Sequence, residues 1–152
     1  MPITITPERP DSPDAKALID ELTEYLTPLS PPESQHGYSV EKLLARNVAF
    51  FVIRSDNEPA SCGGLELFGD EYGEIKRMFV RPKFRGQGLG KLMVNHLCNH
   101  ARSNGVPFVR LETGSMMTDA NGLYERMGFY RISHFGKYRE DPLSNFYEKQ
   151  IA

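Results

Sequence analysis

A glycine-rich turn between a strand-like run and a helical run is the feature that most restricts the fold of this chain. The turn reads Arg85-Gly86-Gln87-Gly88-Leu89-Gly90. Residues 74–80 before it have strand character, and the run after it places apolar side chains on one helical stripe. Glycines let a phosphate approach the backbone, and the first N–H groups of a helix have no partner inside the helix. The segment therefore predicts that residues 86–91 bind a phosphate-bearing ligand.

Two common glycine motifs do not fit this turn. A P-loop requires Gly-Lys-Ser/Thr to hold a magnesium ion, but Gly90-Lys91 is followed by Leu92. A dinucleotide fingerprint requires G-x-G-x-x-G, whereas the glycines here lie at 86, 88 and 90. The pattern that fits is Arg/Gln-x-x-Gly-x-Gly/Ala, which resembles the coenzyme A pyrophosphate loop of the GCN5-related N-acetyltransferase (GNAT) superfamily.

Further segments carry the same resemblance along almost the whole chain. Residues 123–129 resemble a Leu-Tyr-Glu-x-x-Gly-Phe segment of the superfamily, and residues 111–113 resemble its fifth strand. Residues 31–36 and 135–144 resemble a branch of small bacterial members. The resemblance implies a single N-acetyltransferase domain over residues 1–152. It also implies a mixed α/β fold with a central sheet of about seven strands, splayed between strands four and five, and about four flanking helices.

Periodicity and turn residues place the elements in an order that fits this fold. Helices are expected over residues 15–26, 40–45, 89–104 and 119–127. Strands are expected at Ile3–Ile5 and over residues 48–54, 61–67, 74–80, 107–113, 129–132 and 144–149. Residues 27–37 contain three prolines and are expected to form a loop.

The resemblance implies that the ligand is acetyl-CoA, with coenzyme A as product. Backbone groups of Met78, Phe79 and Val80 would contact the pantetheine arm, and one of their N–H groups would polarise the thioester carbonyl. The pyrophosphate would be held by the amides of Gly86, Gln87, Gly88, Leu89, Gly90 and Lys91. Arg85 would either add a charged contact or lie on the surface. Where many relatives have Asn or Gln near the cofactor this chain has Met117, and Asn121 is the closer candidate for a cofactor contact.

Three residues are candidates for the acid and base chemistry. Tyr124 matches the family's general acid, which protonates the departing thiolate. Glu74, eleven positions before Arg85, is a candidate general base, and Glu112 is its rival. A glutamate serves this role best when burial raises its pKa towards 7, and Lys76, on the same strand face as Glu74, would oppose that rise.

The acceptor site is expected to lie between two loops that are rich in polar and aromatic residues, residues 31–38 and 134–146. Glu33, His36, Tyr138 and Asp141 are the candidate acceptor contacts. The acceptor would be a small-molecule amine or a protein amine. His96 and His100 have a possible metal spacing, but the sequence offers no third ligand, so no metal site is expected.

Composition limits the class of protein. The 152 residues carry a net charge of −2, which argues against a general nucleic-acid binder. The sequence contains no apolar run of membrane-spanning length and begins without the blocks of a signal peptide, so a cytoplasmic protein without membrane contact is expected. Aromatic residues between Tyr130 and Tyr147 look exposed and suggest a homodimer.

These observations favour an acetyl-CoA-dependent N-acetyltransferase that moves an acetyl group directly to a primary amine in a ternary complex. The alternative is an acyl-CoA-binding regulatory protein without significant turnover.

Overall fold

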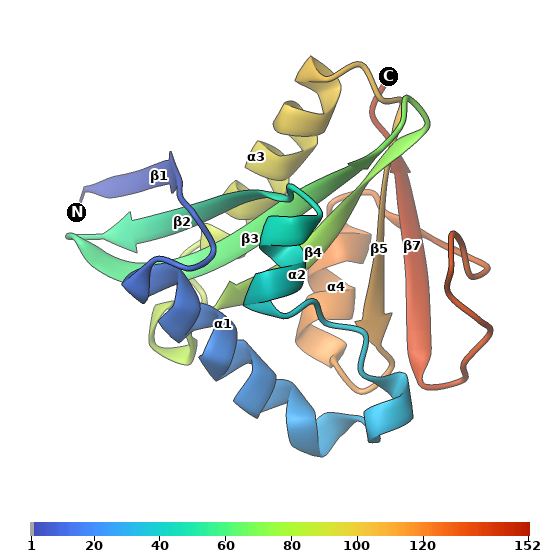
Figure 1. Ribbon diagram of the computed structural model, residues 1–152, viewed down its shortest axis with the longest axis horizontal. Coiled ribbons are helices and arrows are strands. Elements are labelled where there is room, and N and C mark those ends of the chain that lie inside the picture. The colour runs from blue at the N-terminus through green and yellow to red at the C-terminus, as the bar shows by residue number, and fades with distance from the viewer. Residues whose placement is uncertain (1) are drawn as a thin grey trace.

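A mixed sheet of seven strands organises the part of the chain that the computed structural model describes, residues 2–152, so Met1 of the expected 1–152 domain lies outside it. The strand order is β1-β2-β3-β4-β5-β7-β6 (Figure 1). Neighbouring strands are antiparallel except for the parallel pair β4–β5. The strands are β1 (Ile3–Pro7), β2 (Ala49–Ser55), β3 (Glu58–Phe68), β4 (Tyr72–Val80), β5 (Phe108–Gly114), β6 (Tyr130–Ile132) and β7 (Ser144–Gln150).

Helices cover both faces of the sheet (Figure 1). On one face lie α1 (Pro13–Leu26) and α2 (Val40–Ala45), and on the other lie α3 (Leu89–Ser103) and α4 (Thr118–Arg126). The segment expected as a loop after α1 contains two short 3-10 turns, η1 (Thr27–Leu29) and η2 (Pro32–Ser34). The seven strands and four α-helices confirm the fold class expected from the sequence.

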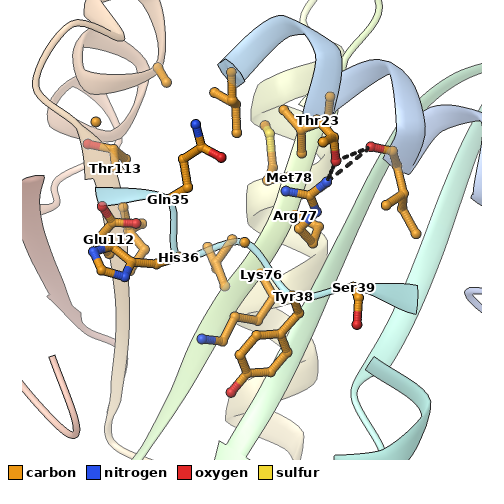
Figure 2. Close-up of a pocket in the computed structure, with 18 of the residues that line it drawn as sticks. Thr23, Gln35, His36, Tyr38, Ser39, Lys76, Arg77, Met78, Glu112 and Thr113 are labelled. Carbon is orange, nitrogen blue, oxygen red and sulfur yellow. Dashed lines mark hydrogen bonds between the residues drawn. The ribbon is translucent and has the colours of Figure 1, made fainter. Parts of the chain in front are cut away.

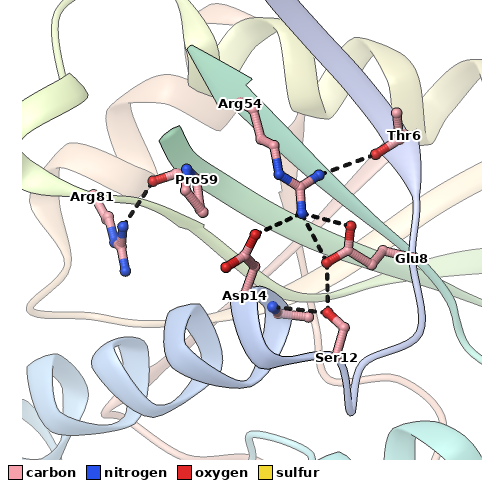
Figure 3. Close-up of polar contacts among 8 residues, drawn as sticks. Thr6, Glu8, Ser12, Asp14, Arg54, Pro59 and Arg81 are labelled. Atoms are coloured by element: carbon pink, nitrogen blue, oxygen red, sulfur yellow. Dashed lines mark hydrogen bonds and ion pairs between the residues drawn. The ribbon is translucent and has the colours of Figure 1, made fainter. Parts of the chain in front are cut away.

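Polar contacts fix where α1 begins. Ser12 caps the helix by accepting a hydrogen bond from the Ala15 N–H at 3.1 Å. Arg54 on β2 lies 2.8 Å from a Glu8 carboxylate oxygen and 2.9 Å from one of Asp14, so it ties the helix start to the sheet (Figure 3). Directly after β4, Arg81 donates to the Pro59 carbonyl at 2.9 Å and pairs with Glu21 of α1. These contacts hold α1 across the sheet.

Two large apolar clusters and one small aromatic cluster form the core. The first packs α3 and α4 on the sheet and includes the fully buried Met93 and Leu97. The second lies under α1 and α2. The third joins Tyr72, Phe135 and Phe146 beneath the loop before β7.

The aromatic residues near the C-terminus correct one expectation from the sequence. Tyr130 is 42% exposed, but Phe135, Phe146 and Tyr147 are buried. Most of the aromatic side chains that suggested a dimer interface therefore belong to the core, and the argument for a homodimer from exposed aromatics was wrong.

The parallel pair β4–β5 is short, and its ending opens the sheet. Only Tyr72–Glu74 of β4 pair with Phe108–Arg110 of β5. Beyond that point β4 continues beside β3, and β5 continues beside β7. The expected splay between the fourth and fifth strands is confirmed.

A β-bulge in β4 lies beside this opening. Two residues of β4, Arg77 and Met78, face one residue of β3, Gly63, and Arg77 has a φ of +52°. A bulge leaves the extra residue unpaired and bends the strand. It thus redirects backbone and side chains at the place where β4 leaves β5.

Candidate functional site

Two adjoining cavities run through the opening between β4 and β5. One, of about 440 Å³, lies at the glycine turn, and the other, of about 720 Å³, lies between the splayed strands and the segment before α2. Together they form one groove, because both are lined by the side chains of Leu22, Met78, Met117, Ala120 and Leu123. We call their two ends the glycine end and the carboxylate end.

The glycine end of the groove is formed by backbone that no side chain covers. Gly86 and Gly88 have φ values of +79° and +80°, and a Cβ atom added to either would meet nothing within 4 Å. Gly88 also precedes the first residue of α3 and provides no side-chain cap, so the first N–H groups of the helix are free to bind an anion. Gly90 serves packing, since a Cβ there would lie 3.0 Å from Leu123 of α4.

The arginine of this turn is exposed. The Arg85 Nε donates to the Val80 carbonyl at 3.1 Å, and its guanidinium lies 5.1 Å from the centre of the Tyr25 ring. Arg85 lines the cavity at the glycine end, so the side chain is available to an anion there.

Tyr124 of α4 lines the carboxylate end and is 4% exposed. Its ring packs against Phe129 and Tyr147, while its hydroxyl makes no hydrogen bond within residues 2–152. Burial raises the pKa of the Tyr124 phenol above its usual value, so the hydroxyl stays protonated at neutral pH. Tyr124 therefore presents a proton to the cavity.

Glu74 of β4 accepts hydrogen bonds from two neighbouring side chains. Its Oε2 accepts from Lys76 Nζ at 2.8 Å and from the Tyr138 hydroxyl at 2.6 Å. Burial raises the pKa of Glu74, and the Lys76 charge and both hydrogen bonds oppose that rise. The ammonium of Lys76 also lies 4.0 Å from the centre of the Tyr38 ring (Figure 2).

A second buried carboxylate, Glu66, was not predicted as a site residue from the sequence. It is directly opposite Glu74 on the neighbouring strand. Like charges in such a pair repel, and here each carboxylate has a cation and a tyrosine hydroxyl as partners. Glu66 accepts from the Tyr38 hydroxyl at 2.7 Å and from Arg46 at 2.7 Å. Glu66 and Glu74 are thus both partnered, although no local motif marked Glu66.

Glu112 of β5 is less compensated than Glu74. Its Oε2 accepts one hydrogen bond, from Ser144 Oγ at 2.7 Å, and it belongs to no ion pair within residues 2–152. Burial raises its pKa to about 7, with the hydrogen bond from Ser144 opposing and the charge of Glu74 adding to the rise. Glu112 is therefore a carboxylate that can exchange a proton near neutral pH.

The two expected acceptor loops meet at the carboxylate end. Ser34 Oγ donates to Asp141 at 2.6 Å, and the His36 ring packs edge-on against Tyr138 with centres 5.3 Å apart. His36 and Tyr138 line the cavity, and so does Glu112. Asp141 lies behind this wall and joins the loops, and Glu33 is exposed in η2.

The structure brings most, but not all, of the expected site residues to the groove. Met78, Phe79, Val80 and the turn residues 85, 86 and 88–91 line the glycine end, and Glu74, Glu112 and Tyr124 line the carboxylate end. Gln87 lies outside both linings. The amide of Asn121 bonds Thr113 and the Gly114 carbonyl, so it joins α4 to the end of β5.

A family model described as the acetyltransferase (GNAT) family matches residues 15–129. The chain belongs to this family. It is 36% identical over 150 residues to an "IAA acetyltransferase" of Azospirillum brasilense, covering 98% of each chain. It is also 35% identical over 137 residues to an uncharacterized N-acetyltransferase of Bacillus subtilis, covering 89% of this chain and 91% of that protein.

Solved structures agree with this assignment. A protein of Klebsiella pneumoniae assigned as an acyl-CoA N-acyltransferase superposes with a TM-score of 0.84 at 32% identity, covering 99% of this chain and 98% of that one. A GNAT family acetyltransferase of Elizabethkingia anophelis, solved with acetyl-CoA bound, has a TM-score of 0.73 at 20% identity and covers 97% of both chains. The second likeness supports the fold alone.

Residues 2–152 contain neither a candidate membrane-spanning helix nor a candidate metal-binding cluster. None of the helices described there is both long and apolar enough to cross a bilayer. The same residues contain no cluster of three or more His, Cys, Asp or Glu side chains placed to hold a metal ion.

The raised pKa of Glu112 predicts how a variant changes stability with pH. Its folded-state pKa of about 7 exceeds the ordinary value of 4.5. The folded protein therefore loses stability as the pH rises from 4.5 to about 7, where the carboxyl ionises more readily in the unfolded chain. Glu112→Gln should therefore raise the melting temperature relative to wild type by several degrees at pH 8 and by much less at pH 5, because one pKa unit is worth about 1.4 kcal/mol.

Melting curves of both proteins from pH 5 to pH 8 measure this effect. Glu33→Gln removes an exposed carboxylate and is the matched control for the loss of one carboxylate. A Glu112→Gln variant whose difference from wild type does not change with pH contradicts the assignment.

Proposed function

We propose that this protein is an acetyl-CoA-dependent N-acetyltransferase that moves an acetyl group directly to a primary amine in a ternary complex. The observation that carries the proposal is the continuous groove through the opening between β4 and β5. One end offers free backbone amides and open glycines, and the other offers a protonated phenol and a carboxylate with a raised pKa. Family membership supports acyl transfer.

The residues at the glycine end fit coenzyme A. The free amides at the start of α3 and the open space at Gly86 and Gly88 suit a pyrophosphate. The strand edge of β4 freed after Glu74 offers backbone groups along the groove to an extended pantetheine arm. When bound, the coenzyme supplies an acetyl thioester as the electrophile.

The residues at the carboxylate end would carry the proton transfers. An amine is protonated at neutral pH and cannot attack until it loses a proton, which Glu112 accepts directly or through water. As the amine nitrogen formed its bond to the acetyl carbon, the carbon–sulfur bond would break and Tyr124 would donate its hydroxyl proton to the leaving thiolate. The second proton that the nitrogen loses when the amide forms would return to the Tyr124 oxygen, directly or through water. A backbone N–H of residues 78–80 would stabilise the negative charge on the carbonyl oxygen.

Glu112 suits the base better than Glu74 does. Glu74 holds Lys76 and Tyr138, and withdrawing its charge would leave the Lys76 ammonium without its carboxylate. Glu112 has a single hydrogen-bond donor and a pKa of about 7. Protonating Glu112 therefore disturbs the surrounding charges less, and we assign Glu74 to holding the wall of the site.

Acetyl-CoA should stabilise the protein through the glycine turn. At about 100 times Kd a ligand adds roughly 2.7 kcal/mol, which is a rise of about 5–10 °C in melting temperature for a domain of this size. Coenzyme A should have a similar effect and ATP little. Gly88→Ala should reduce the rise, because its Cβ would project into the space assigned to the pyrophosphate.

Gly105→Ala is the matched control for that measurement. Gly105 has a φ of +78° and equally open surroundings, but it follows the far end of α3. Both variants introduce the same backbone strain, so only loss of the ligand effect in Gly88→Ala supports the proposed site. Full stabilisation of Gly88→Ala by acetyl-CoA would exclude it.

Removing the Tyr124 hydroxyl should slow turnover without weakening binding. Positioned acids contribute on the order of 100-fold or more, so Tyr124→Phe should lower kcat by about that factor and leave the melting shift with acetyl-CoA intact. Tyr147→Phe is the control, since its hydroxyl is bonded to Glu125 and it lies outside the cavity lining.

Thiol release with a panel of amines measures turnover. Equal turnover of wild type and Tyr124→Phe would remove the phenol from the mechanism. Strong acetyl-CoA binding without thiol release from any amine would favour the alternative of an acyl-CoA-binding regulatory protein.

The pH dependence of kcat/KM should identify the base. Wild type should lose activity below an apparent pKa of about 7, because protonated Glu112 cannot accept the proton of the amine. Glu112→Gln should be slow and lack this limb, while Glu74→Gln should keep it. The opposite pattern would assign the base to Glu74.

A further inference from the structure

Arg77 is a cation in the wall of the carboxylate end that has no carboxylate partner. Among residues 2–152, no ion pair within 4.0 Å includes it. Its Nη2 donates to the Ile19 carbonyl at 3.0 Å and to the Thr23 hydroxyl (Figure 2). Its Nε is buried and has no partner in the described part of the chain.

The other cation deep in this wall is compensated. Lys76 lies 2.8 Å from Glu74 and beside the Tyr38 ring. A guanidinium that is taken from water without an anion costs folding free energy, and burial lowers the pKa of Arg77 accordingly. Cys62 and the Asp20 carboxylate oppose this lowering of the pKa, but no described carboxylate lies within 4.0 Å of the Arg77 guanidinium.

The geometry leaves one end of this guanidinium available. Nη1 has no hydrogen bond within residues 2–152 and is not among the fully buried polar atoms. Gly37 lies against it so closely that an added Cβ would be 2.1 Å from Nη1. Gly37 and the contacts to α1 thus hold the guanidinium in place at the cavity.

Arg77 also stands close to the centre of the groove. It directly precedes Met78, which lines both cavities, and it occupies the β4 bulge. Figure 2 shows Arg77 on one side of the cavity and Glu112 with Thr113 on the other. A ligand between them would meet a cation on one side and a carboxylate on the other.

We propose that Arg77 binds a carboxylate of the acceptor, so that the acceptor is an amino acid or a similar small amine with a carboxylate a few bonds from its nitrogen. This inference rests on the proposed N-acetyltransferase function and specifies its substrate class. The ammonium of such a zwitterion would face Glu112 and its carboxylate would face Arg77. Guanidinium and carboxylate form strong charge-assisted hydrogen bonds.

The charges of the cavity favour a carboxylate over a phosphate. Glu74 and Glu112 line the same cavity, and they would repel a dianion more strongly than a zwitterion without net charge. The lining also contains Asp11, Asp20 and Glu41, so a polyamine would find anions in this cavity, but it would leave Arg77 without a carboxylate. An amino-carboxylate would pair its ammonium with Glu112 and its carboxylate with Arg77.

Thiol release from a panel of amino acids, each paired with its carboxamide, tests the inference. Wild type should prefer at least one acid over its carboxamide by about 10-fold or more in kcat/KM, because hydrogen bonds to charged groups are worth that much. Arg77→Met should reduce this preference to within about threefold, mainly through KM. The same pair of amines is compared in each protein, so differences in amine reactivity cancel.

Arg81→Met is the matched control. Arg81 also joins the β4 region to α1, through Glu21, but lies outside both cavity linings. It should keep the preference for the acid. Gly37→Ala provides a second variant that keeps the charge of Arg77 and displaces its guanidinium, and it should also weaken the preference.

The outcomes separate the two proposals. Equal or better use of carboxamides by wild type overturns the inference and leaves the acetyltransferase in place. An equal loss with acids and carboxamides in Arg77→Met shows that Arg77 only anchors α1 and also overturns the inference. Absence of thiol release from every amine, in protein that acetyl-CoA stabilises, overturns the proposed function and the inference with it.

Discussion

The ending of the β4–β5 pairing is the constraint on which the rest of the site depends. Parallel strands normally continue their ladder, but here the ladder stops after Tyr72–Glu74 and Phe108–Arg110. Each strand remains paired on its other side, so the sheet survives the opening. Backbone groups that would have bonded across the gap instead face the groove. The bulge at Arg77 and Met78 turns β4 at the same place, so one local interruption creates both the cavity and its polar lining.

Buried charges near the opening divide into two groups with different consequences. Glu66 and Glu74 face each other across β3 and β4, and Tyr38, Arg46, Lys76 and Tyr138 supply their donors and opposing charges. Such a network holds a wall rigidly because breaking any contact leaves a charge uncompensated. Glu112 and Arg77 stand outside it. Their charges are available to a ligand because the rest of the wall is already satisfied.

Sequence reasoning located the elements well, because their signals are local. The periodic stripe of α3, the short α2 and the glycine turn all depend on near neighbours in the chain, and their residues lie where the sequence predicted them. The family resemblance supplied the splay, which spacing could not show. The bulge at Arg77 was missed because it arises from pairing with β3, and an arginine at positive φ has no sequence signature. Phe135 and Phe146 were misjudged because their burial depends on Tyr72, far away in the chain.

Polar groups without full sets of partners distinguish the proposed catalytic and acceptor-binding residues of this wall from the residues around them. In the lining of the carboxylate end, Tyr38, Tyr138, Glu74 and Lys76 are held by hydrogen bonds or an ion pair. The Tyr124 hydroxyl and the Arg77 Nε and Nη1 atoms have no such partner among residues 2–152, and Glu112 accepts a single hydrogen bond. A buried polar atom without a partner weakens a folded protein, and among these three residues Arg77 has one, its Nε. A ligand with a proton to lose, a carboxylate to bind and a leaving group to protonate would complete all three.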